Sequence, residues 1–187
     1  MNQSCRLSEN TKRYLERFYC ILEEMITGMT GAEQTESISY DFIVQMIPHH
    51  QAAIEMSRNL LCYTTNLPLE RLAEGIIQEQ TESIAQMQAV LSCCSQVCNC
   101  EQEQCLYRRR AEQILETMFS QMECAEECNC INHNFIREMI PHHRGAIRMS
   151  ENALRFEICP ELVPILDAII TSQCQGVREM ERLLRCC

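Results

Sequence analysis

The sequence has few of the residues that build turns, and it has no tryptophan. Glycine and proline occur five times each in 187 residues, and aromatic residues make up only 5%. A chain of many short strands needs more turn residues than this, so the composition disfavours an all-β fold and favours helices. Hydrophobic residues reach 46% and charged residues 22%, which indicates a folded, globular chain.

Long apolar runs and positive charge are also scarce. No stretch approaches the roughly 20 apolar residues that a membrane-spanning helix requires, and the first residues lack the apolar run of a signal peptide. The formal net charge is -10, and the few aromatic residues offer little for base stacking. We therefore expect a cytoplasmic protein with neither a membrane nor a nucleic acid as its partner.

Sulfur-containing residues are, by contrast, abundant, with 15 Cys and 11 Met. The cytosol keeps thiols reduced, so there a high Cys count favours metal ligation or redox chemistry over structural disulfides. Thiolates and thioethers are soft ligands that suit copper(I), and thiolates also suit zinc. Taken singly, a Met is better explained as a core filler, and a free Cys can be a small buried hydrophobe. Their positions along the chain must therefore decide which are ligands.

The chain contains one unit twice, at an offset of 93 residues and without a gap. The clearest repeat pairs residues 41–50 with residues 134–143, and both segments end in Met-Ile-Pro-His-His. Two repeats are too few for a solenoid. We therefore predict a first repeat at residues 1–94 and a second at residues 95–187, which cover each other's apolar faces in one compact domain.

Each repeat is predicted to form three helices, because apolar residues recur every three or four positions. The expected helices cover residues 9–28, 39–63 and 69–92, and residues 105–121, 131–156 and 161–185. Ser39 or Asp41 is expected to cap the second helix, and Pro48 and Pro141 to kink or restart theirs. The second and third helices of both repeats predict a four-helix bundle with the first helices outside it. The expected fold class is all-α, a duplicated three-helix unit with pseudo-twofold symmetry.

A buried stripe on the second helix of each repeat carries methionine and histidine together. At about 100° per residue, these side chains fall on the same side as the apolar residues. Neutral imidazole is a common metal ligand, and thioethers add affinity for copper(I) and silver(I). Methionines of the third helices are expected to face this stripe. The candidate ligands are Met46, His49, His50, Met56 and Met87, and in the second repeat Met139, His142, His143, Met149 and Met180.

Two alternatives to this metal face stay open at the level of sequence. The histidines also fit a core feature whose nitrogens are satisfied by Gln80, Gln173 or a carboxylate. Adjacent histidines point in different directions, so one ligand from each pair would suffice. A ferritin-like redox enzyme would use Glu-x-x-His on facing helices, but a methionine stands three residues before His49 and before His142. We therefore expect a metal-binding protein and not an enzyme.

The cysteines form a second set of candidate metal ligands. They gather between the repeats, before the second Met-His helix and at the end of the chain: Cys93, Cys94, Cys98, Cys100 and Cys105; Cys124, Cys128 and Cys130; Cys186 and Cys187. If a twofold axis relates the repeats, the helix ends can gather these thiols into one or two polynuclear sites. Zinc at thiolate sites and a disulfide-linked structural protein are the alternatives.

The paired motifs resemble a known family. The segments at residues 46–56 and 139–149 match the pattern Met-Ile-x-His-His-x-x-Ala-Ile-x-Met. This is similar to the signature of a family of ferritin-like domains of unknown function that includes the CopM-type copper-binding proteins. The resemblance covers roughly residues 38–92 and 131–185. It implies a ferritin-like four-helix-bundle core with two additional helices and, for some members, copper or silver binding at the Met and His residues.

The sequence thus predicts a soft-metal-binding protein that serves metal sequestration, buffering or resistance. Copper(I) is the expected ion, with silver(I) and zinc as the alternatives. The expected partners are the metal ions themselves, with a metal-donor protein and a second copy of the chain as further candidates.

Overall fold

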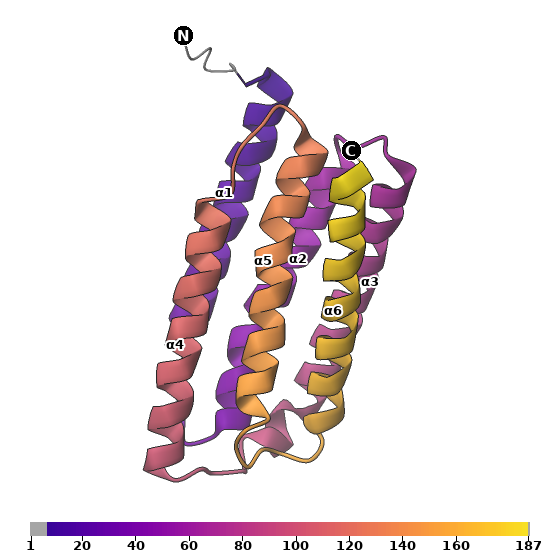
Figure 1. Ribbon diagram of the computed structural model, residues 1–187. Coiled ribbons are helices and arrows are strands. Elements are labelled where there is room, and N and C mark those ends of the chain that lie inside the picture. The colour runs from indigo at the N-terminus through magenta and orange to yellow at the C-terminus, as the bar shows by residue number, and fades with distance from the viewer. Residues whose placement is uncertain (1–6, 187) are drawn as a thin grey trace.

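The computed structural model describes residues 7–186, without the side chain of Cys186, and all its regular structure is helical (Figure 1). The six helices are α1 (Glu9–Thr30), α2 (Ile38–Leu61), α3 (Leu67–Cys94), α4 (Glu101–Glu123), α5 (Ile131–Ala153) and α6 (Val163–Cys186). The predicted all-α fold is confirmed, with helix ends that differ from the prediction by a few residues. None of the described helices combines the length and the apolar character needed to cross a membrane.

The core is a bundle of α2, α3, α5 and α6. Helix α2 packs on α3 and α5 packs on α6, while the contacts of α2 with α5 and of α3 with α6 join the two halves. Helices α1 and α4 lie outside this bundle, against α2 and α5 respectively (Figure 1). This is the predicted arrangement of a four-helix core with two additional helices.

The same side-chain contact holds each outer helix in place. Asn59 of α2 donates from Nδ2 to the carbonyl of Tyr14 in α1 at 3.0 Å. Asn152 of α5, which lies 93 residues further on, donates to the carbonyl of Tyr107 in α4 at 3.2 Å. Both tyrosine side chains are buried in the hydrophobic core. The two halves therefore attach their first helix to their second helix in the same way, as pseudo-twofold symmetry requires.

The predicted cap of α2 was wrong, and neither α2 nor α5 restarts at its proline. Ser37 caps α2, because its hydroxyl accepts from the Tyr40 backbone N–H at 3.2 Å. Asp41 is used elsewhere and accepts from the backbone N–H of Thr35 at 2.7 Å. Pro48 lies inside α2, which continues through it as one helix, and Pro141 does the same in α5.

The ring of Pro48 packs against α1, and this contact is a physical reason why α2 continues through the proline. A Cβ atom added to Gly28 of α1 would lie only 2.8 Å from the Cβ of Pro48. Proline removes a single hydrogen bond from the helix interior, and close packing against the neighbouring helix offsets part of that loss. The helix therefore does not have to restart.

One buried carboxyl joins the outer helix of the first half to the core of the second half. The Tyr14 hydroxyl of α1 donates to Oε2 of Glu138 in α5 at 2.6 Å, and both side chains are buried. Desolvation raises the pKa of Glu138 to about 8, against the opposing effect of the Tyr14 hydrogen bond. The position equivalent to Glu138 in the first half is Gln45, which carries no charge.

Replacing Glu138 by Gln tests this buried carboxyl. Because its pKa is higher in the folded than in the unfolded chain, Glu138 contributes stability at low pH that is lost as the pH rises from 4.5 to about 8. We expect the Glu138→Gln variant to have the same free energy of unfolding as the parent near pH 5. At pH 8 its free energy of unfolding should be higher by a few kcal/mol, which is the order of magnitude that the shift of the Glu138 pKa on folding implies. Urea unfolding at both pH values measures the difference.

The exposed Glu116 serves as the control, because its replacement by Gln should give the same small effect at both pH values. An equal effect of Glu138→Gln at pH 5 and pH 8 would contradict a raised pKa.

Candidate metal-binding site

His49 of α2 and His142 of α5 meet where the two halves of the bundle are joined. Their ring centroids lie 3.7 Å apart, and the ring planes are inclined by 30°. His49 Nε2 lies 3.2 Å from the carbonyl oxygen of His142, and His142 Nε2 lies 3.1 Å from the carbonyl oxygen of His49. A carbonyl oxygen only accepts hydrogen bonds. Each Nε2 therefore carries the proton and donates it to the opposite helix.

This contact leaves two lone pairs in the core. Burial lowers the pKa of His142 to about 4 and that of His49 well below 6.5, so both rings are neutral near pH 7. A neutral imidazole with its proton on Nε2 has a free lone pair on Nδ1. Among the described residues, neither Nδ1 has a hydrogen-bond partner, although both rings are fully buried. An unprotonated imidazole nitrogen of this kind is a ready metal ligand.

The second histidine of each pair points to a different place, between α3 and α6. His50 Nε2 lies 3.0 Å from the hydroxyl of Ser83. His143 has Gly176 at the equivalent place, and a Cβ atom added there would lie 2.9 Å from the ring. Burial lowers the pKa of His50 to about 3 and that of His143 well below 6.5.

Two small clefts between α3 and α6 reach these outer histidines. One has a volume of about 140 Å³ and is lined by His50 and Gln80, and the other, of about 130 Å³, is lined by His143. Glu79 lines both clefts. Its pKa is raised, chiefly by desolvation and then by the nearby carboxylates of Glu82 and Glu179. The clefts therefore bring acidic side chains to the same histidines that the sequence singled out.

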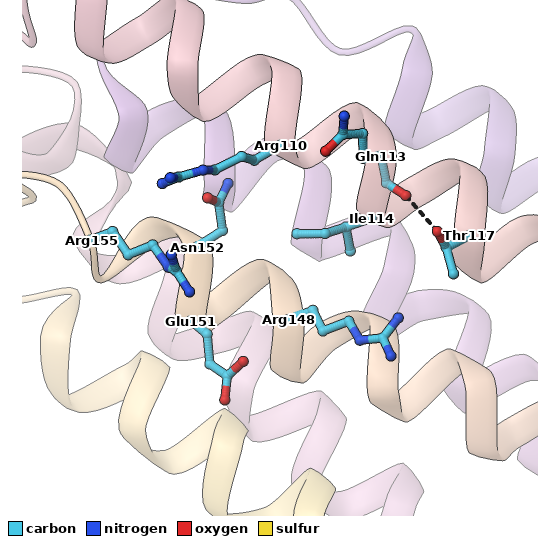
Figure 2. Close-up of a pocket in the computed structure, with 8 residues that line it drawn as sticks. All are labelled: Arg110, Gln113, Ile114, Thr117, Arg148, Glu151, Asn152 and Arg155. Carbon is cyan, nitrogen blue, oxygen red and sulfur yellow. Dashed lines mark hydrogen bonds between the residues drawn. The ribbon is translucent and has the colours of Figure 1, made fainter.

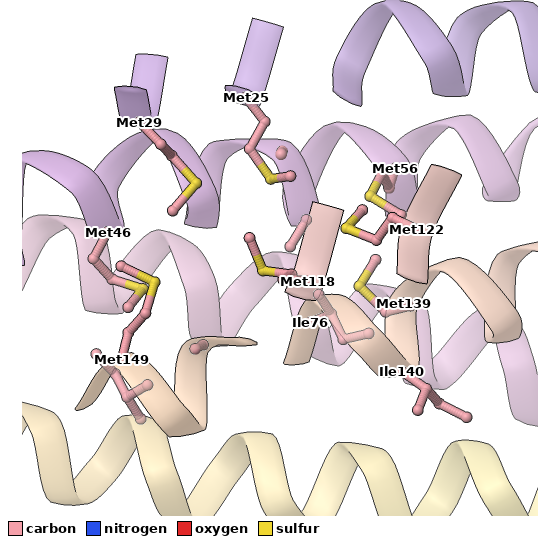
Figure 3. Close-up of a cluster of buried hydrophobic side chains, with 14 of the residues drawn as sticks. Met25, Met29, Met46, Met56, Ile76, Met118, Met122, Met139, Ile140 and Met149 are labelled. Carbon is pink, nitrogen blue, oxygen red and sulfur yellow. The ribbon is translucent and has the colours of Figure 1, made fainter. Parts of the chain in front are cut away.

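The predicted methionines are all buried, at 0 or 1% exposure: Met46, Met56, Met87, Met139, Met149 and Met180. In Figure 3, the thioether of Met46 on α2 points toward that of Met149 on α5. Met56 of α2 and Met139 of α5 point toward one another as well, with Met122 of α4 beside them. The sulfur pairs thus combine one methionine from each half, whereas the sequence pattern grouped methionines of the same helix.

The glutamines that the sequence offered as partners do not satisfy the histidines. Neither Gln80 nor Gln173 is hydrogen-bonded to an imidazole, and the Oε1 atom of each is buried without a partner among the described residues. Nor does any described group of three His, Cys or carboxylate ligand atoms within 4.8 Å include a histidine.

At one end of the bundle, two of the predicted cysteines lie beside a third cysteine that the sequence did not single out. Sγ atoms of Cys93, Cys94 and Cys159 all lie within 4.8 Å of one another. Desolvation raises the pKa of Cys94 and of Cys159. Cys159 lies just before α6, and its repeat equivalent is Asn66, so a search guided by the repeat passes over it. The signal that would have found it is topological, because the end of α3 meets the segment that leads into α6.

The remaining predicted cysteines do not join a group of three ligand atoms within the described part of the chain: Cys98, Cys100, Cys105, Cys124, Cys128 and Cys130. They are free thiols in the structure. Cys128 donates weakly to Oδ1 of Asn134 at 3.3 Å. Cys187 and the side chain of Cys186 lie outside the described residues, so the predicted pairing of the helix ends stays a prediction.

A separate groove between α4 and α5 has a different chemistry (Figure 2). Its volume is about 340 Å³, and its lining includes Arg110, Arg148 and Arg155 together with Glu151. No histidine, methionine or cysteine lines it. This groove is therefore not part of the sulfur and imidazole site.

Two glycines allow a matched test of how tightly the methionine core is packed. A Cβ atom added to Gly145 of α5 would clash with the Met118 thioether and lie 2.9 Å from Met118 Cγ, whereas one added to Gly75 of α3 meets nothing within 4 Å. We expect Gly145→Ala to lower the free energy of unfolding by about 1–3 kcal/mol. Gly75→Ala should raise it by about 0.5–1 kcal/mol through helix propensity. Chemical unfolding measures both, and a stabilising Gly145→Ala would contradict close packing around Met118.

Comparison with known proteins gives a family and a fold. The sequence matches the family described as Domain of unknown function (DUF305), over residues 22–91 and 39–184. A search of curated proteins finds no match. The structure is similar to CopM in its silver-bound form, obtained by soaking, with 25% identity, a TM-score of 0.60 and coverage of 81% of this chain and 97% of that one. It is also similar to a DUF305 fragment from Deinococcus radiodurans, with 24% identity, a TM-score of 0.58 and coverage of 80% and 97%.

Proposed function

The chain belongs to the DUF305 family, and from this premise we propose that it binds soft metal ions, copper(I) first, in the core where α2 meets α5. The observation that carries the proposal is the pair of buried, unprotonated Nδ1 atoms of His49 and His142, which have no hydrogen-bond partner among the described residues. A buried polar atom left without a partner costs about 1–3 kcal/mol. A bound cation would remove that cost at both rings.

The surrounding side chains favour a soft ion. Thioethers and imidazoles select copper(I) and silver(I), whereas magnesium and calcium require oxygen ligands. Two pairs of buried methionines, each with one member from α2 and one from α5, supply candidate thioethers: Met46 with Met149, and Met56 with Met139. The silver-bound state of the similar protein CopM is consistent with this ligand preference. Zinc is the weaker candidate, since its sites are built from thiolate, imidazole and carboxylate ligands.

The buried position of these ligands suits retention of the ion. Both histidines and the paired methionines are at most 1% exposed, so a bound ion would be shielded from competing ligands. The clefts between α3 and α6 are lined by two predicted ligands, His50 and His143, which lie next in sequence to the two central histidines. Slow release and a shielded site fit sequestration, buffering or resistance, which we place in the reducing environment of the cytoplasm.

Exchanging methionine for leucine tests the thioether ligands. Met46→Leu together with Met139→Leu conserves volume, so the helical content should be retained and the stability cost should stay below about 1.5 kcal/mol per site. We expect the copper(I) affinity of the core to fall at least about tenfold, the equivalent of 1.4 kcal/mol. Competition with a copper(I) chelator measures it in a background with Cys93→Ser and Cys159→Ser, with the remaining thiols blocked by alkylation so that they do not compete for copper(I).

The matched control is Ile43→Leu with Ile136→Leu, a pair of fully buried positions that also lie 93 residues apart. This control should leave the copper affinity unchanged. If the methionine variant binds copper(I) as tightly as the control does, the thioethers are not ligands.

A further inference from the structure

We propose that Cys93, Cys94 and Cys159 form a three-thiolate site for a single copper(I) ion, separate from the Met-His core. The three Sγ atoms lie within 4.8 Å of one another, and the Sγ atoms of Cys93 and Cys159 are 3.5 Å apart. With a metal–sulfur bond of about 2.3 Å, two thiolates on one ion stand about 3.8–4.0 Å apart. The three sulfurs therefore need only small rotamer adjustments to enclose an ion.

The backbone around the cluster is held by the N-terminal end of α2. The Ser37 hydroxyl donates to the carbonyl of Cys94 at 2.7 Å. The Ser39 hydroxyl accepts from the backbone N–H of Cys159 at 2.9 Å, and both serines are buried. Two neighbouring serines of one helix end thus position the two chain segments that supply the thiols. Ser39, expected from the sequence to cap α2, instead fixes Cys159.

The side chain of Asn99 makes further hydrogen bonds that hold the backbone near the three cysteines. Asn99 Nδ2 donates to the carbonyl of Glu157 at 2.8 Å, and its Oδ1 accepts from the backbone N–H of Ile38 at 3.1 Å. Asn99 is buried and lies in the connection after α3. It therefore ties that connection both to α2 and to the segment before α6. A ligand set whose backbone is held in advance loses less conformational entropy on binding.

The exposure of the three cysteines suits uptake from solvent. Cys93 is exposed, whereas Cys94 and Cys159 are buried. The sulfur of Cys93 is thus open to an incoming copper donor, and the ion would pass from Cys93 to the two buried sulfurs. Binding forms three copper–sulfur bonds and releases the thiol protons, and copper stays in the +1 state throughout, so no oxidant or reductant is required.

The ligand set favours copper(I) over zinc. Three soft sulfurs complete a trigonal copper(I) site, whereas a structural zinc ion takes four ligands. The carboxylate of Glu161 accepts from Cys159 Sγ at 3.0 Å, but it does not belong to the described group whose ligand atoms all lie within 4.8 Å of one another. Zinc would have to recruit such a fourth ligand, whereas copper(I) is complete with the three sulfurs. This site does not depend on the proposed function of the core, because it shares no residue with it.

Copper(I) titration of the full chain under anaerobic, reducing conditions tests the site through its thiolate-to-copper charge-transfer absorption. We expect Cys93→Ser and Cys159→Ser each to lower the affinity measured by this band at least 100-fold. Cys62→Ser, at an exposed cysteine outside the cluster, should leave it unchanged. Met46→Leu with Met139→Leu should also leave it unchanged, which separates this site from the core. Circular dichroism confirms that each variant retains its helices.

Three results would overturn the assignment. The first is a charge-transfer band at the first equivalent of copper(I) whose affinity is unchanged by Cys93→Ser and by Cys159→Ser in folded protein. The second is a Cys93–Cys159 disulfide in protein kept under reducing conditions, detected by mass spectrometry. The third is zinc that binds stoichiometrically at these cysteines and is not displaced by copper(I).

Discussion

The structure depends on one reciprocal contact, in which His49 and His142 each donate a hydrogen bond to the backbone carbonyl of the other. It joins α2 to α5 and therefore one half of the chain to the other. It also determines the tautomer of both rings, because only a protonated Nε2 can satisfy a carbonyl. The cost is a lone pair on each Nδ1 that the described residues leave without a partner. The hydrogen bonds that join the two halves are thus also the reason why each Nδ1 carries a lone pair that a metal ion could bind.

The unpartnered atoms of the core follow the repeat. Besides the four paired histidines, the hydroxyls of Ser57 and Ser150 and the Oε1 atoms of Gln80 and Gln173 are buried without partners among the described residues, and each pair is 93 residues apart. Three further unpartnered atoms, on Arg108, His133 and Asn152, do not follow the repeat. Buried polar groups are nearly always satisfied in native proteins. A set of exceptions that occurs in both halves is what the proposed ion site would explain, because a soft cation among the methionines would satisfy the imidazole lone pairs.

The sequence alone predicted the features that depend on the spacing of residues within one helix. Periodic apolar residues predicted the helices and the bundle, and the same periodicity placed His49 and Met46 on the buried side. Features that depend on contacts between distant segments escaped it. The cap at Ser37, the continuity of α2 through Pro48 and the convergence of methionines from opposite halves all require the neighbouring helix. Cys159 was missed for the same reason, since only the tertiary structure brings it to Cys93.

The most direct test of the central claim is nitrogen-15 NMR of protein labelled at histidine and titrated with silver(I), a closed-shell stand-in for copper(I). Before addition, His49 and His142 should show a protonated Nε2 and an unprotonated Nδ1. The account predicts that silver(I) shifts the Nδ1 resonances of both rings while Nε2 keeps its proton. Silver(I) that continues to bind after the thiols are saturated and leaves both Nδ1 resonances unchanged would contradict it.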